Sequence, residues 1–113
     1  MILEAELERV DATTAVFRLT GRMTLGMRLR EIESKITHAA DQPVKKLVLE
    51  LSGVEFIDSA GLGALMILYG NMKVRGGQLR IVAPASKVLD VLKITHTDSI
   101  LPIDQTLEAA LAA

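Results

Sequence analysis

One stretch of the sequence decides the fold: LVLELSGVEFIDSAGLG, from Leu47 to Gly63. Its first five residues are almost wholly apolar, which is typical of a central strand buried on both faces. Glu50 is expected at the end of that strand, because a buried ionised carboxylate is costly. Residues 52–57 read as a loop. A helix from about Ala60 to Arg75 follows, and two glycines stop it.

The flanking sequence supplies the other elements. Upstream, residues 2–10 and 15–20 alternate as a hairpin, and a helical period begins at Thr24 as N-cap and ends at Asp41-Gln42-Pro43. Downstream we expect a strand at 78–82, a helix from Ala85 or Ser86 through Leu92, a short strand at 99–101, and a last helix capped by Asp104 and ending at Leu111. This order predicts one α/β domain over residues 1–113. It has a mixed, mostly parallel β-sheet with an N-terminal antiparallel hairpin and about four helices.

Composition excludes several classes of protein. The 113 residues are half apolar, 3% aromatic and free of cysteine, which suits one core and rules out a disulfide framework, a thiol nucleophile and a thiolate metal site. Thirteen basic and 14 acidic residues give a net charge of −1, so nucleic-acid binding is not expected. Apolar runs of at most four or five residues and an acidic N-terminus predict no membrane segment and no signal peptide. We therefore expect a soluble, cytoplasmic domain, whose oligomeric state the sequence leaves open.

No enzyme motif is complete. Gly61-Leu62-Gly63 lacks the third glycine of a dinucleotide fingerprint, since Met66 stands in its place. There is no Walker-type phosphate loop, and Ile57 replaces the first glycine of a nucleophile elbow around Ser59. Two histidines far apart in the sequence make a poor metal site. His96 could in principle approach Ser59 as the base of a small hydrolase. The main expectation is a protein without catalytic activity, cofactor or metal.

Ser59 is the strongest candidate functional residue. It should be exposed at a helix N-terminus, where unpaired N–H groups and the helix dipole favour negative charge. The simpler alternative is that Asp58 or Ser59 only caps the helix. The small residues Ala60, Gly61 and Gly63 would let another macromolecule approach the serine closely. Close packing of the helix on the sheet is the rival explanation for the glycines.

The stretch from Leu47 to Gly63 resembles the signature of the STAS family, which includes the bacterial anti-sigma factor antagonists. The resemblance extends over nearly the whole chain, including the Thr20-Gly21 turn and the Gly76-Gly77 pair before a strand. It implies a partner-switching role in sigma-factor-dependent transcription. An unphosphorylated antagonist binds an anti-sigma factor that is also a serine kinase, and the phosphorylated antagonist releases it. A PP2C-type phosphatase is a further implied partner.

The resemblance also implies which residues act. Phosphorylation falls on Ser59, and the expected partner-binding residues are Thr24, Met27, Asp58, Ser59, Ala60, Gly61, Leu62 and Gly63. A phosphate adds about −1.5 to −2 charge, so we expect it to act on the interface rather than on the fold. Further contacts could come from four apolar residues, most of which we expect in the core: Met23, Leu25, Met66 and Tyr69.

Two departures from the family pattern leave an alternative open. Many antagonists carry acidic residues where this chain has Arg22, Met23 and Thr24. Ala60 replaces a second hydroxyl, which makes Ser59 the sole acceptor in the loop. The first departure is also consistent with a non-phosphorylated STAS subunit of another assembly, such as a lipid-transport accessory or a stressosome-like scaffold.

Overall fold

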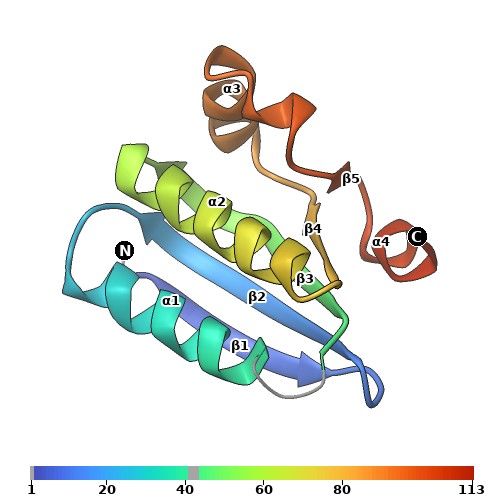
Figure 1. Ribbon diagram of the computed structural model, residues 1–113. Coiled ribbons are helices and arrows are strands. Elements are labelled where there is room, and N and C mark those ends of the chain that lie inside the picture. Colours follow the sequence, from blue (N-terminus) through green and yellow to red (C-terminus); the bar gives the residue numbers. More distant parts are fainter. Residues whose placement is uncertain (1, 41–43) are drawn as a thin grey trace.

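A computed structural model describes residues 2–40 and 44–113 (Figure 1). The described elements, in chain order, are β1 (Glu4–Arg9), β2 (Thr14–Met23), α1 (Met27–Ala40), β3 (Lys46–Ile57), α2 (Ser59–Val74), β4 (Gln78–Val82), α3 (Ser86–Ile94), the 3₁₀ helix η1 (Thr97–Ser99), β5 (Ile103–Asp104) and α4 (Leu107–Ala112). The strands form one sheet in the order β1-β2-β3-β4-β5. β1 runs antiparallel to β2, and the other neighbours are parallel. These observations confirm the predicted α/β fold with an N-terminal hairpin.

β3 is the centre of the structure, and both of its faces are covered. Leu47, Leu49 and Leu51 are fully buried in the main core beneath α1 and α2, which lie together on one face of the sheet (Figure 1). Val48 points the other way, as the alternation of a strand requires, and joins a smaller apolar cluster with Ala110 of α4. The apolar run therefore forms the predicted strand buried on both faces.

The loop predicted at residues 52–57 is wrong, because β3 continues to Ile57. The pairing with β2 shifts between Arg18↔Glu50 and Thr20↔Gly53, so that β3 carries one extra residue, a β-bulge. Ser52 and Gly53, which suggested a loop, lie at this bulge. Glu50 consequently lies within the strand rather than at its end. It is partly exposed, and its Oε1 accepts a hydrogen bond from the Ser52 N–H at 2.6 Å.

The chain after α3 also differs from the prediction. Residues 97–99 form η1, and the strand lies later, at Ile103–Asp104. Asp104 does not cap the last helix, because its carboxylate accepts two hydrogen bonds from the Arg80 guanidinium of β4, with Nε–Oδ2 at 2.5 Å and Nη2–Oδ1 at 3.0 Å. The N-cap of α4 is Thr106, whose hydroxyl accepts from the Ala109 N–H at 3.1 Å. A contact distant in sequence thus decides the role of Asp104.

The start of α1 is the third difference. The helix begins at Met27, and the Arg30 N–H donates to the Gly26 carbonyl at 3.4 Å, so Thr24 is not its N-cap. The predicted stop at Asp41-Gln42-Pro43 lies outside the described residues. The segment between β2 and α1 consequently includes Thr24 and Leu25, which follow the end of the strand at Met23.

Candidate functional site

Ser59 is the first residue of α2, and its side chain is exposed. Asp58 precedes it as the N-cap, with an extended backbone at φ −104° and ψ −172°. The Asp58 Oδ1 accepts a hydrogen bond from the Gly61 N–H at 2.9 Å. The predicted helix start is correct, and Asp58 rather than Ser59 caps the helix. The Ser59 hydroxyl is therefore accessible at the N-terminus of the helix, where the dipole favours negative charge.

The second carboxylate oxygen of Asp58 binds a distant segment. Its Oδ2 accepts from the Leu25 N–H at 2.9 Å, and the Asp58 N–H donates to the Met23 carbonyl at 3.2 Å. The hydrogen bond from Leu25, followed by that from Gly61, lowers the pKa of Asp58 below its ordinary value. Asp58 is therefore ionised at neutral pH, and each of its oxygens already accepts a backbone hydrogen bond.

The two glycines near the start of α2 differ in whether packing within the chain requires them. A Cβ at Gly61 would lie 2.2 Å from the Met23 carbonyl oxygen and 2.7 Å from Ile57 Cγ1. Close packing of α2 on the end of β2 thus explains this glycine. A Cβ at Gly63 would meet nothing within 4 Å. No contact within the described chain requires a glycine at position 63.

The structure brings two predicted parts of the site together, because the Asp58–Leu25 hydrogen bond places the backbone of Leu25 beside the start of α2. Leu25 and Met27 have exposed fractions of 73% and 78%, so these two possible contact residues are not in the core. Other predicted residues contribute less surface: Thr24, Asp58, Ala60, Leu62 and Gly63 are partly exposed, as are Met66 and Tyr69, and Gly61 and Met23 are buried. The accessible surface consists mainly of the Ser59 hydroxyl and two large apolar side chains.

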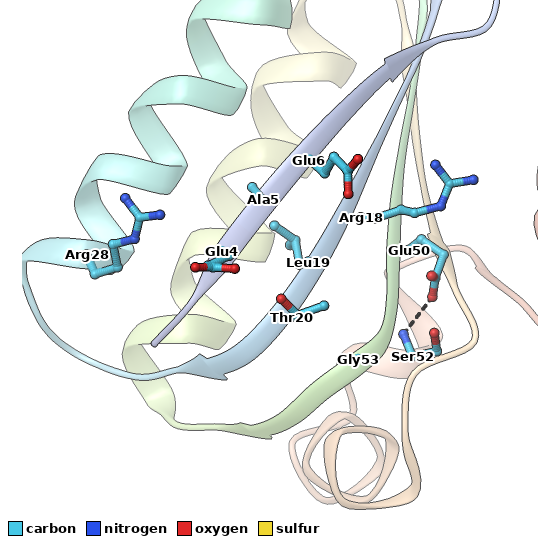
Figure 2. Close-up of a pocket in the computed structure, with 10 residues that line it drawn as sticks. All are labelled: Glu4, Ala5, Glu6, Arg18, Leu19, Thr20, Arg28, Glu50, Ser52 and Gly53. Atoms are coloured by element: carbon cyan, nitrogen blue, oxygen red, sulfur yellow. Dashed lines mark hydrogen bonds between the residues drawn. The ribbon is translucent and has the colours of Figure 1, made fainter. Parts of the chain in front are cut away.

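A separate cavity of about 440 Å³ lies over β1, β2 and β3 (Figure 2). Its lining includes the carboxylates of Glu4, Glu6 and Glu50, together with Arg18, which forms an ion pair with Glu8 at 2.5 Å. None of the residues predicted for the site lines it.

Among the described residues, no group of three or more histidine, aspartate and glutamate side chains is arranged to hold a metal ion. No helix in the described ranges is long and apolar enough to cross a membrane.

Comparison with known proteins gives consistent matches. Residues 4–110 match a family model described as STAS domain. A protein of Thermotoga neapolitana, provisionally named an anti-sigma factor antagonist, is 39% identical over 66 residues, which are 58% of this chain and 58% of that relative. The crystal structure of an anti-sigma factor antagonist from Mycobacterium paratuberculosis is 26% identical, with a TM-score of 0.83 over 97% of this chain and 92% of that one.

The Bacillus protein SpoIIAA, an anti-sigma factor antagonist, has the same fold. Its unphosphorylated form has a TM-score of 0.79 at 22% identity, over 94% of this chain and 92% of that one. A phosphorylated form of SpoIIAA has also been solved and has a TM-score of 0.73 to this chain. The architecture is thus shared by both forms of that protein.

Proposed function

The chain belongs to the STAS domain family, and we propose that it is an anti-sigma factor antagonist whose partner binding is switched off by phosphorylation of Ser59. The names of the similar proteins support the general role. One observation carries the switch: Ser59 is exposed at the first position of α2, next to the ionised carboxylate of Asp58, which binds the backbone of the exposed Leu25. Such a surface suits a partner that contacts an uncharged side chain at this position.

Electrostatics explains why a phosphate would act on binding and not on folding. Phosphorylation adds about −1.5 to −2 charge beside Asp58, which is already ionised. The N-terminus of a helix tolerates an anion, and Ser59 is exposed, so the phosphate remains hydrated in the folded chain. A partner pressed against Leu25 would have to desolvate that charge, which is costly unless a cation compensates it. Release of the partner follows.

The proposed partner is an anti-sigma factor that is also a serine kinase. It would transfer the γ-phosphoryl group of ATP to the Ser59 Oγ, with ADP as the leaving group and loss of the hydroxyl proton. A PP2C-type phosphatase would hydrolyse the phosphate and restore binding. Because the antagonist frees a sigma factor when it holds the anti-sigma factor, the chain would regulate transcription in the cytoplasm.

Two Ser59 variants test this proposal. Ser59→Asp should keep the unfolding midpoint of the wild type and bind the anti-sigma factor at least tenfold more weakly by isothermal titration calorimetry. Ser59→Ala is the matched control: it should bind like the wild type and accept no phosphate from the kinase. Intact-mass analysis of protein from its native host, before and after phosphatase treatment, should show one phosphate that Ser59→Ala lacks. Equal affinity of Ser59→Asp and Ser59→Ala, with both folded, would refute the switch.

A further inference from the structure

We infer that Asp58 is a positioning residue: its carboxylate holds the backbone at Leu25 against the start of α2, so that the exposed Leu25 is kept close to Ser59. The inference rests on the proposed function, because the surface that Asp58 organises is the one that the anti-sigma factor would contact. It assigns to Asp58 a role different from direct partner contact.

Both carboxylate oxygens of Asp58 accept hydrogen bonds within the chain. Oδ1 accepts from the Gly61 N–H and Oδ2 accepts from the Leu25 N–H, each at 2.9 Å. Hydrogen bonds to an ionised acceptor are about twice as strong as those between neutral groups. Each oxygen keeps a second lone pair, but both oxygens already join elements of this chain. Asp58 therefore acts through the elements that it joins.

Burial does not hold the side chains of Leu25 and Met27 in place. The exposed fractions of Leu25 and Met27 are 73% and 78%, and a Cβ at Gly26 between them would meet nothing within 4 Å. The chain is buried on either side, at Met23 and at Leu29. Between those two anchors, the Leu25 N–H bond to Asp58 ties the backbone of the segment to α2.

Substitution can separate the two roles of Asp58, which are capping α2 and binding the Leu25 N–H. Capping needs one side-chain oxygen, and serine caps a helix about as well as aspartate. The tie to Leu25 needs a second oxygen on the opposite side of the same group. Asp58→Ser should therefore keep the cap on Gly61 and lose the tie to Leu25. Asp58→Ala loses both.

The test measures three quantities for the wild type, Asp58→Ser and Asp58→Ala. They are the amide hydrogen exchange rate of Leu25 by NMR, the urea midpoint, and the affinity for the anti-sigma factor kinase by calorimetry. We expect the Leu25 exchange rate to rise about tenfold in both variants, as for the loss of one hydrogen bond of about 1.4 kcal/mol. The midpoint should fall in both variants, and further in Asp58→Ala, which also loses the cap. Affinity should fall about tenfold in both, and Ser59→Ala should leave the Leu25 exchange rate unchanged.

Two results would overturn the inference. If Asp58→Ser exchanges and binds like the wild type while Asp58→Ala does not, capping is the whole role of Asp58. If the Leu25 exchange rate rises in Asp58→Ser but affinity stays the same, the Leu25 segment is not part of the interface. Failure of the proposed function is a different result, because the wild type itself would then bind no anti-sigma factor. The Leu25 exchange rates would in that case still show whether Asp58 holds the segment.

Discussion

Alanine at Gly61 and alanine at Gly63 should have opposite effects on stability. The added Cβ at position 61 would lie 2.2 Å from the Met23 carbonyl oxygen, whereas real Cβ contacts do not fall below 3.0 Å. The start of α2 would have to move away from β2 by about 1 Å, at a cost of about 1–3 kcal/mol for overpacking. That movement would also stretch the Asp58–Met23 backbone hydrogen bond, which is 3.2 Å long. Alanine regains about 0.5–1 kcal/mol of helix propensity, so the net loss for Gly61→Ala is about 0–2.5 kcal/mol.

Gly63→Ala is the matched control, because it makes the same chemical change two residues later without a clash. It should raise the free energy of unfolding by about 0.5–1 kcal/mol, since a Cβ there meets nothing within 4 Å. Urea denaturation followed by circular dichroism at constant pH measures both values. If Gly61→Ala is as stable as Gly63→Ala, the packing explanation for Gly61 is refuted. If partner contact explains Gly63, Gly63→Ala should also bind the anti-sigma factor more weakly despite its higher stability.

Three other perturbations follow from the hydrogen bonds. Two backbone N–H groups lower the pKa of Asp58, so its ionised form stabilises the fold above the ordinary aspartate pKa of about 3.9, and that stabilisation is lost as pH falls through the lowered value. The difference in urea midpoint between the wild type and Asp58→Asn should therefore begin to shrink below about pH 4. Lys46→Met removes an ammonium that donates to two α4 carbonyls at 3.0 Å, and should speed amide exchange in α4 while lowering stability by about 1 kcal/mol. Asp104→Ala leaves the partly buried Arg80 without its carboxylate and should lower the free energy of unfolding by about 1–3 kcal/mol in urea denaturation. Glu8→Ala, in an exposed ion pair with Arg18, should lower it by less than about 1 kcal/mol.

The elements that the sequence predicted well are those whose signal is local. Periodicity and the flanking glycines located α2 and β4 to within a residue or two, because an apolar stripe and its stop lie within one short window. The extension of β3 through Ser52 and Gly53 could not be predicted in this way. These residues are poor strand formers, and pairing with β2 across a bulge overrides their propensity. The prediction of a strand at 99–101 was wrong for a similar reason. The strand lies at Ile103–Asp104, where Asp104 pairs with Arg80 of β4, a contact distant in sequence.

The same division applies to the site. A capping residue beside an exposed serine is a local pattern, and it located the helix start at Asp58-Ser59 but left open which of the two caps the helix. The contact between Asp58 and Leu25 joins residues 33 positions apart, and no periodicity or spacing indicates it. Whether Met23 or Leu25 would be buried depended on where β2 ended and α1 began, which is the least reliable part of a sequence prediction. Thr24 was for this reason wrongly expected to start the helix.

The motif from Asp58 to Gly63 therefore combines residues that are needed for two different reasons. Asp58 and Gly61 build the junction between β2 and α2, because one supplies two acceptors and the other leaves room for the Met23 carbonyl. A chain that used this junction only for folding would still need both. Ser59 is exposed and Gly63 has no neighbour at its Cβ position, so folding requires neither a hydroxyl at the first position nor a glycine at the second. In chains with this fold, a serine and a glycine at these two positions should therefore accompany the proposed phosphorylation switch, whereas the aspartate and the inner glycine should accompany the fold.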